Sequence, residues 1–266
     1  CFAFHSGLLA AGCPSPEDNH PLHGEFPCAP MRSARLVTKH EPCGVSAVTL
    51  VSDYEYRMGF GHRYLAQPTV TLRTDSAMFD IDLEVTNLSN YQSMPLQYMC
   101  HMNYAFIPDA RMSQSLPDGA FQLRRSVPDH VTPTHQWLRI NEEILAGKID
   151  ADSLVGAEAF DPEIVYFADD LPQYGKTAEF RMQARAHHDF VTRFRTDQFP
   201  VATRWILHNA DQRVAAYVLP GTSRPEGRLA AEAAGTLIHL DAGATRTFSV
   251  TTGLLAQGEA VGREAQ

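Results

Sequence analysis

Apolar and polar residues alternate along much of this chain. The segment MFDIDLEVTN at residues 78–87 is the clearest case, because every second residue is apolar: Phe79, Ile81, Leu83 and Val85. Such a period of two predicts an antiparallel strand with one buried face. The same period, bounded by Pro, Gly, Asn or Asp, predicts further strands. They cover residues 45–52, 69–74, 96–104, 163–169, 189–196, 203–209, 213–218, 235–241 and 246–253.

Two segments have the spacing of a helix. In HQWLRINEEILAG, residues 135–147, apolar residues such as Trp137 and Ile140 fall near one face, and Gly147 can end the helix. The segment LAAEAA at residues 229–234 predicts a second, short helix. Many strands, few helices and no alternation of strands with helices predict an all-β fold, an antiparallel β-sandwich.

The chain shows no linker and no internal repeat. We therefore expect a single domain over residues 1–255. The last segment, residues 256–266, has too little apolar content to pack and is predicted to be a disordered tail.

The composition and charge of the chain argue against some classes of partner. The chain has 266 residues, of which 44% are hydrophobic, enough for a substantial core. Its formal net charge of −9 argues against a nucleic-acid partner, whose phosphates it would repel. No run approaches roughly 18 apolar residues, so no membrane partner is expected. The five cysteines form neither a disulfide framework nor a CxxC pair, which favours a cytoplasmic location.

A proline-rich segment, HPLHGEFPCAP at residues 20–30, holds candidate chemistry. His20, His23 and Glu25 fall close together and are flanked by prolines. Proline disfavours a helix or a central strand, so the segment is predicted to be a loop. Taken alone, the three side chains are consistent with a metal site, an acid–base site or a chance surface cluster.

A second group of polar side chains lies on a predicted strand. In QYMCHMNYAF, alternation places Gln97, Met99, His101 and Asn103 on one face and turns Cys100 to the other. A histidine beside an asparagine on one sheet face suits a polar ligand. The simpler interpretation is a core histidine whose ring nitrogens are satisfied by neighbours.

Several longer motifs include these two groups and resemble those of one family. In chain order they are GLLAAGCPSPEDNHPLHGEFPCAP, FGHRYLAQPTVTL, VTNLS, YMCHMNYAF, DPEIVYFADDL, TRWILHN and VLPGTSRPEGR. This order, from about residue 7 to about residue 255, resembles the galactose mutarotase (aldose 1-epimerase) superfamily in its DUF4432-type branch. Within that branch, the segments HPLHGEFPCAP and MCHMNYAF are most similar to those of the deoxyribose mutarotases. The resemblance implies the antiparallel supersandwich of that family, with few short helices.

The same resemblance bears on the start of the chain. Members of the family carry several more strands before the GLL segment. This chain begins with Cys1 rather than Met and lacks the charged start of a signal peptide. We therefore expect that some N-terminal strands of the natural protein are missing here.

The resemblance implies a mechanism that uses neither metal nor cofactor. A mutarotase opens the hemiacetal ring of a free sugar: a base removes the C1 hydroxyl proton while an acid protonates the ring oxygen. Rotation about the C1–C2 bond and closure by the same groups give the other anomer. By resemblance, His101 is the acid, His23 lies near the ring or anomeric oxygen, and Glu163 binds a sugar hydroxyl. An ordinary histidine pKa of about 6.5 suits proton exchange at neutral pH.

The chain departs from the family pattern at the base. The family carries a glutamate on a late strand, and Leu219 stands at that position in AYVLPGTSRPEGR. Glu226, seven residues further on beside the flexible Gly227, is predicted to be the catalytic base. A solvated loop carboxylate explains Glu226 equally well. Glu163 and Glu25 are the fallback bases.

Substrate contacts are predicted from Asn103, Glu163, Arg204 and Glu25. Arg204 and Trp205 point to opposite faces of one strand, so one can line the site while the other packs in the core. The core is the expected place of Trp205. The predicted partner is a small-molecule sugar, and the protein is compatible with a homodimer.

Three functions from different classes therefore compete. The first is a cofactor-free mutarotase, with deoxyribose as the candidate sugar. The second is a metal-dependent, cupin-like enzyme with His20, His23, Glu25 and His101 as ligands, although a proline between the first two disfavours a ligand-bearing strand. The third is a non-catalytic sugar-binding domain, which Leu219 in place of the glutamate keeps open.

Overall fold

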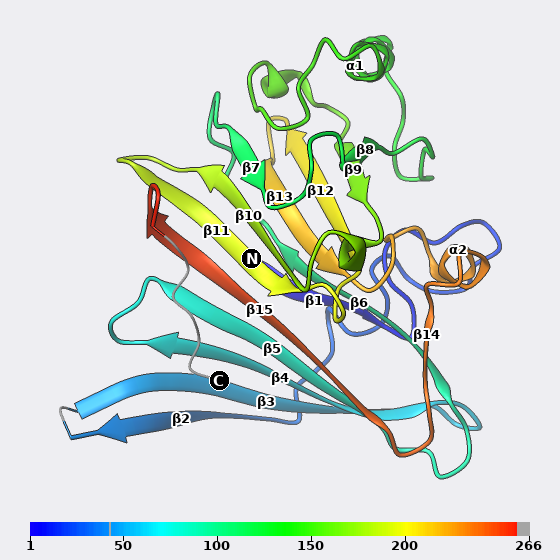
Figure 1. Cartoon of the computed structure of the whole chain (residues 1–266). Helices are drawn as coiled ribbons and strands as arrows, with labels where there is room; N and C mark the ends of the chain where they lie inside the picture. Colours follow the sequence, from blue (N-terminus) through cyan, green and yellow to red (C-terminus); the bar gives the residue numbers. More distant parts are fainter. Residues whose placement is uncertain (43, 260–266) are drawn as a thin grey trace.

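Two antiparallel sheets pack against each other and form the body of the protein (Figure 1). The computed structural model describes residues 1–42 and 44–259. In spatial order, the first sheet consists of β1 (Ala3–Leu8), β6 (Met94–Met102), β13 (Arg213–Gly221), β12 (Val201–His208), β9 (Ile164–Ala168) and β8 (Gln122–Leu123), with β14 (Ile238–Leu240) beside β6. The second consists of β2 (Ser33–Glu41), β3 (Gly44–Arg57), β4 (Arg63–Arg73), β5 (Met78–Asn87), β15 (Thr245–Ala256), β11 (His188–Arg195), β10 (Thr177–Gln183) and β7 (Met112–Gln114). The predicted antiparallel β-sandwich is confirmed.

The hydrophobic core lies between the two sheets. Tyr98 of β6 contacts Phe248 of β15, with ring centroids 4.9 Å apart. β5 shows how the sequence pattern builds this core, because Leu83 is buried whereas Glu84 next to it is exposed. The strand predicted at residues 78–87 is therefore confirmed at both ends.

The described residues form two α-helices and two short 3-10 helices at the margins of the sandwich (Figure 1). They are α1 (His135–Leu145), α2 (Arg228–Ala233), η1 (Ala157–Ala159) and η2 (Leu171–Gln173). The Thr134 side chain caps α1 by accepting a hydrogen bond from the Trp137 backbone N–H at 3.1 Å. Trp137 and Ile140 are buried, as the apolar face of the predicted helix requires. Among the described residues, no helix has the length and apolar character needed to cross a membrane.

Five strands lie outside the predicted set: β1, β2, β7, β8 and β10. β1 carries His5 and Gly7 and therefore lacks a clear apolar period. β10 does have the period, with Phe180 buried between two charged neighbours, although no strand was predicted there. At the other end of the chain, Ala256 ends β15, and residues 260–266 of the predicted tail lie outside the described residues.

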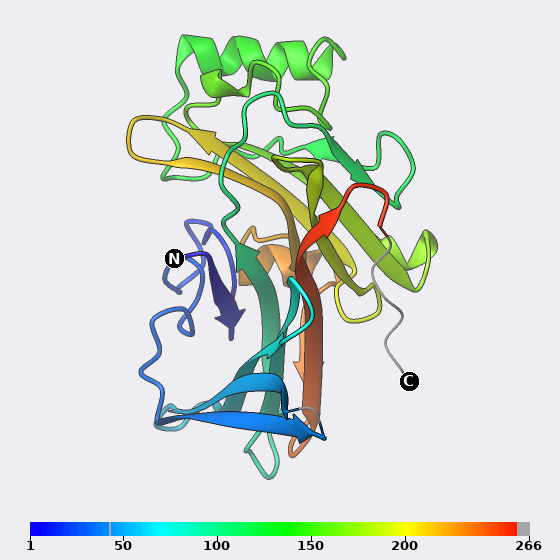
Figure 2. The ribbon, with the colours of Figure 1, turned by 90° about the vertical axis from the view of Figure 1, so that its left-hand side faces the viewer.

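One row of cross-strand partners runs across the second sheet from β2 to β15. Its members are Leu36, Leu50, Val70, Ile81 and Val250. Directly paired residues share one face of a sheet, and Ile81 and Val250 are only 5% and 1% exposed in the core. Leu36 and Leu50, at the β2 end, are 69% and 43% exposed. The first sheet therefore covers the second only in part, and Figures 1 and 2 show β2 and β3 at the far margin.

Candidate active site

β1 and the loop that follows it bring two histidines together. β1 pairs with β6, and Phe4 is the cross-strand partner of His101. The chain then folds back on β1, where the Gly7 N–H donates to the His23 carbonyl at 2.9 Å. As a result, the rings of His23 and His101 lie 5.3 Å apart between centroids, at an angle of 82°. Two histidines from separate sequence motifs are thus neighbours in the fold.

The backbone of this loop is specialised at His23. His23 has a φ of 65° and Gly24 a φ of 81°, both in the left-handed region. A Cβ atom at Gly24 would lie 2.1 Å from the Ala10 carbonyl oxygen, so only glycine fits there. From β1, Ser6 Oγ lies 3.3 Å from His23 Nδ1. These contacts hold the His23 ring against the sheet.

Two aromatic rings pack against the ring of His101. Phe4 stacks on it at 4.4 Å and 17°, and Trp205 stands edge-on at 5.9 Å and 64°. His101 is 7% exposed, and its Nδ1 atom has no hydrogen-bond partner among the described residues. Burial, and after it the nearby His23, lowers the pKa of His101 to about 3, while Asn103 acts in the opposite direction. The ring is therefore neutral at neutral pH. An unpaired buried nitrogen is costly, and a polar group of a ligand would satisfy it.

Glu163 lies just before β9 and belongs to the same cluster. Its Oε2 accepts a hydrogen bond from the Trp205 indole N–H at 2.7 Å, and its Oε1 accepts one from Arg124 at 3.0 Å. His130 Nε2 lies 3.4 Å from Oε1. The carboxylate charge also reaches His23: burial lowers the pKa of His23, Glu163 opposes this shift, and His130 adds to it. The structure thus places Glu163 near His23 and connects it to His101 through Trp205.

Glu226 lies in the loop between β13 and α2, at the border of the cluster. The Ser126 hydroxyl donates to its carboxylate, and Arg224 lies 3.8 Å away. Burial raises the pKa of the Cys13 thiol to about 11, and the charges of Glu163 and Glu226 both add to that shift. Both carboxylates therefore act on one half-buried thiol. The described contacts of Glu226 are with Ser126 and Arg224 rather than with a histidine.

Glu25 holds the loop in place. Its Oε1 accepts hydrogen bonds from the Leu9 backbone N–H at 2.9 Å and from the Tyr64 hydroxyl at 2.8 Å. These bonds tie the proline-rich loop to the end of β1 and to β4. The carboxylate is occupied by them, so this placement supports neither the predicted sugar contact nor the fallback role as a base.

Arg204 lies on the opposite face of the sheet from the cluster. It is fully buried, and its guanidinium donates to Asp152 at 2.7 Å and to the Tyr217 carbonyl at 3.0 Å. Alternation along β12 then turns Trp205 toward His101. The expected assignment is reversed, because Arg204 packs in the core and Trp205 lines the site. This placement does not support the predicted sugar contact of Arg204.

Asn103 comes directly after β6 and remains close to the cluster. Its Nδ2 donates to the Cys1 carbonyl at 3.3 Å, while its Oδ1 has no partner among the described residues. Asn103 therefore keeps an acceptor available two residues from His101.

Leu219 stands beside His101 in the sheet. Gly221 of β13 pairs with Met99 of β6, and the same register sets Leu219 opposite His101. Leu219 is 1% exposed. A carboxylate at this position would lie next to the imidazole, and here an apolar side chain occupies that place.

Four residues of the cluster were not predicted to belong to it: Phe4, Arg124, His130 and Trp205. Trp205 could have been found from alternation with Arg204, had the charged residue been assigned to the core. The other three stand in segments without a recognised motif, and only the tertiary fold brings them to the histidines and to Glu163.

The metal-dependent alternative lacks a ligand cluster. Within residues 1–42 and 44–259, no group of three or more His, Cys, Asp and Glu side chains could hold a metal ion. Glu25 is bound to backbone N–H groups, and His20 lies 3.7 Å from Asp18. The four residues proposed as ligands therefore do not converge.

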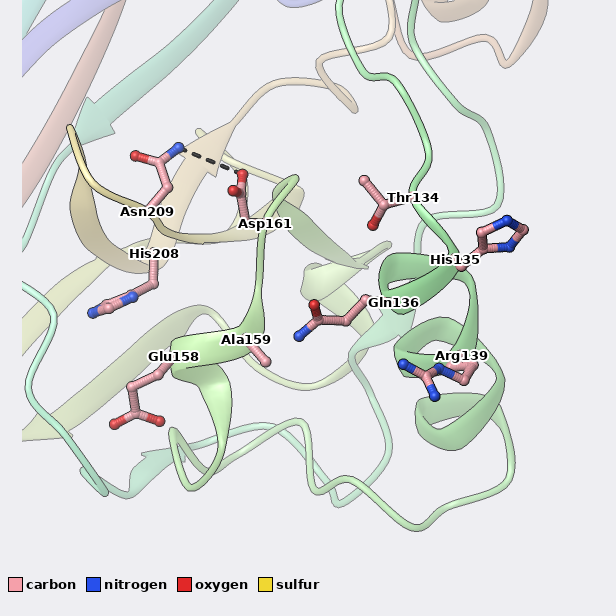
Figure 3. A pocket seen from close by; sticks show the side chains of 9 residues that line it. All are labelled: Thr134, His135, Gln136, Arg139, Glu158, Ala159, Asp161, His208 and Asn209. Carbon is pink, nitrogen blue, oxygen red and sulfur yellow. Dashed lines mark hydrogen bonds between the residues drawn. The ribbon is translucent and has the colours of Figure 1, made fainter.

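A separate cavity of about 650 Å³ lies between α1, η1 and the end of β12 (Figure 3). Its lining is polar, but the side chains do not converge. Figure 3 shows the rings of His135 and His208 pointing away from each other. His208 instead contacts Phe106, with ring centroids 4.7 Å apart. Ligand sites need a few convergent polar groups, so the histidine cluster is the better candidate.

No family model and no curated protein matches this sequence. Several solved structures do match. A candidate aldose 1-epimerase from Klebsiella pneumoniae has a TM-score of 0.76 at 16% identity, over 96% of this chain and 63% of that one. The chain therefore spans less than two thirds of the length of that protein. A candidate aldose 1-epimerase from Escherichia coli K12 has a TM-score of 0.60 at 15% identity, over 96% of this chain and 84% of that one.

A galactose mutarotase-like protein from Lactobacillus casei has a TM-score of 0.57 at 14% identity, over 95% of this chain and 84% of that one. Identities this low show a shared fold rather than a shared reaction. The order of the strands, the two packed antiparallel sheets and these similarities together show that the chain has the galactose mutarotase-like β-sandwich fold.

Proposed function

We propose that this protein is an aldose mutarotase, which interconverts the α and β anomers of a free sugar. The observation that carries the proposal is the contact between His23 and His101, with an unpaired buried nitrogen on His101. Glu163 joins the cluster through Trp205. The resemblance of the sequence motifs and the fold shared with aldose 1-epimerase-like proteins support the same reaction.

In the proposed mechanism, the protonated fraction of His101 gives its proton to the ring oxygen while Glu226 takes the proton of the C1 hydroxyl, and the bond between C1 and the ring oxygen breaks. The open aldehyde then rotates about the C1–C2 bond. Return of both protons closes the ring with the opposite configuration, so no proton or electron is consumed overall. His23 is proposed to bind the ring or anomeric oxygen, and Asn103 a sugar hydroxyl.

The two carboxylates receive different roles because their surroundings differ. Glu163 has fixed donors on both oxygens, from Trp205 and Arg124, so it is oriented to accept a hydrogen bond from a sugar hydroxyl. Glu226 accepts a hydrogen bond from Ser126, lies 3.8 Å from Arg224, and has a side chain that is 26% exposed, which leaves it more open to receive a proton. We therefore assign the base to Glu226 and the hydroxyl contact to Glu163.

The proposed substrate is deoxyribose, on the similarity of HPLHGEFPCAP and MCHMNYAF to the deoxyribose mutarotases. A saturation-transfer NMR screen against deoxyribose, ribose, galactose, glucose and their phosphates identifies the sugar that binds. Exchange between its anomers, followed by NMR exchange spectroscopy, then tests the reaction. Binding with exchange at the background rate would instead support a non-catalytic sugar-binding domain, which the apolar Leu219 beside His101 favours.

Substitution of the carboxylates tests their roles. Glu226→Gln keeps the size of the side chain and removes its capacity as a base, so kcat should fall by about 100-fold with little change in KM. Glu163→Gln should mainly raise KM. Glu232→Gln, an exposed carboxylate of α2, is the matched control and should change neither. A silent Glu226→Gln together with lost turnover in Glu163→Gln would invert the assignment.

A further inference from the structure

We infer that Trp205 is a positioning residue of this site, a role that rests on the proposed mutarotase function. Its indole N–H orients the Glu163 carboxylate, while its ring covers one side of the His101 imidazole. Trp205 acts through these two groups.

The contacts of Trp205 reach both partners at once. Its Nε1 donates to Glu163 Oε2 at 2.7 Å, and its ring lies 5.9 Å from that of His101. Arg124 holds the other carboxylate oxygen at 3.0 Å. A carboxylate with one fixed donor on each oxygen keeps a single orientation, and loss of the indole donor leaves it free to turn about its bond to Cγ.

Arg204, the neighbour of Trp205 on β12, lies at an irregularity in the sheet. The pairing of β12 with β13 shifts between Thr203 and Trp205, so that two residues of β13 oppose Arg204 alone. Arg204 Nε donates to the Tyr217 carbonyl inside this bulge at 3.0 Å. Bulges are frequent next to active sites. Arg204 thus holds the bulge of β13 from the core, directly beside Trp205, while β12 pairs with β9 without a shift and sets Trp205 opposite Val165.

The chain provides a matched control for Trp205. It has two tryptophans, and both indoles donate to Glu163. Trp137 of α1 donates to the backbone carbonyl at 3.0 Å, whereas Trp205 donates to the carboxylate. Substitution of Trp137 therefore removes a hydrogen bond to the backbone of Glu163 and leaves both donors to its carboxylate in place.

Turnover measurements compare the two tryptophans. Trp205→Phe keeps an aromatic ring beside His101 and removes the N–H donor. KM for deoxyribose should rise by about 10-fold, the effect of one hydrogen bond, while kcat changes little. Trp137→Phe should leave KM unchanged. Equal KM values in Trp205→Phe and the unsubstituted protein would overturn the inference.

An NMR titration of the His101 ring needs no turnover, so it separates failure of this inference from failure of the proposed function. Trp205→Ala opens one side of the ring to water, and the pKa of His101 should rise from about 3 toward its ordinary value of 6.5. In Trp137→Ala and Trp205→Phe the pKa should stay low. If the pKa of His101 also stays low in folded Trp205→Ala, Trp205 does not shield the His101 ring from water. If Trp205→Ala does not fold, the same titration is carried out on Trp205→Leu. Absence of anomer exchange for every sugar in the unsubstituted protein would reject the mutarotase, while this titration still decides the role of Trp205.

Discussion

β1 and β6 place two histidines on opposite faces of one sheet, His5 half-buried and His101 buried. His5 points between the sheets, where its Nδ1 meets the Tyr98 hydroxyl at 2.8 Å. His101 points outward under the proline-rich loop, and its Nδ1 meets no partner in the described part of the chain. Burial lowers the pKa of both, to about 4 for His5 and, together with the charge of His23, to about 3 for His101. The two rings differ in the hydrogen bond more than in the pKa, so the unpaired nitrogen marks the site better than the shifted pKa does.

Substitution by asparagine should therefore lower the rate at His101 and the stability of the fold at His5. General acid catalysis contributes roughly 10²–10⁴-fold, so His101→Asn should slow anomer exchange at least 100-fold and leave the protein folded. His5→Asn removes a packed ring and its bond to Tyr98, and should lower the free energy of unfolding by about 1–3 kcal/mol. NMR exchange and thermal unfolding by circular dichroism measure the two effects. Unchanged exchange in His101→Asn would remove this histidine from the mechanism.

Leu219→Glu would change the surroundings of His101 and not those of His5. Leu219 is 1% exposed, so an unpaired charge there should cost about 3–5 kcal/mol of unfolding free energy. Ion pairing with His101 would offset part of this cost and raise the pKa of His101. Urea unfolding and an NMR titration of the ring measure both quantities. An unaltered pKa of His101 in the folded variant would show that Leu219 does not face the ring.

Acid should destabilise the protein through both histidines alike. Each has a folded-state pKa below 6.5, so the unfolded chain binds more protons as the pH falls. The stabilisation from the neutral rings is complete above about pH 6.5. It is lost as the pH falls from about 6.5 to about 4 for His5 and to about 3 for His101. The slope should reach about 1.4 kcal/mol per pH unit for each group. Urea unfolding at stepped pH measures this slope, and His5→Asn and His101→Asn should each reduce it; equal slopes in all three proteins would contradict the assignment.

Of the two histidines, only His101 should affect the pH dependence of the rate. The protonated fraction of His101 rises about tenfold for each pH unit until the pKa is reached, so kcat/KM should keep rising below pH 6.5 until the base takes up protons. An acid with an ordinary pKa would instead give a plateau below that pH. A pH–rate profile by polarimetry distinguishes the two forms.

The smallest effect is expected from Tyr98→Phe, which leaves His5, like His101, without a hydrogen-bond partner at Nδ1. His5 then loses its hydrogen-bond partner at Nδ1, which should cost about 1 kcal/mol of stability. Anomer exchange per folded molecule should stay the same, because His5 faces the core. A slower rate in this variant would show that the two faces of the sheet are coupled.

Much of the fold could be predicted because a strand with one buried face leaves a period of two in the sequence. β5 has this period and was predicted with both ends. β2 lacks it for a physical reason, since all of its residues are exposed and neither face selects for apolar side chains. β1 is held by pairing with β6, and its own pattern is interrupted by His5 and Gly7.

The site could be predicted only where residues carry a motif. The resemblance of the motifs paired His23 with His101, and the structure brings these rings into contact. The contact of Glu163 with Trp205 depends on the pairing of β12 with β9, which no local pattern records. Glu25 stands in the same motif as His23, but its bonds to backbone N–H groups depend on how the loop folds back on β1.

The partly uncovered second sheet affects how the protein behaves at high concentration. β2 is the terminal strand of its sheet in the described part of the chain, and it carries the exposed Leu36 next to the exposed Leu50 of β3. A long edge strand with apolar side chains offers backbone donors and acceptors to like strands of other molecules. The net charge of −9 keeps molecules apart at low salt, and added salt screens that repulsion. We therefore expect self-association in a concentrated, salted sample to begin at β2, on a strand that takes no part in the proposed chemistry.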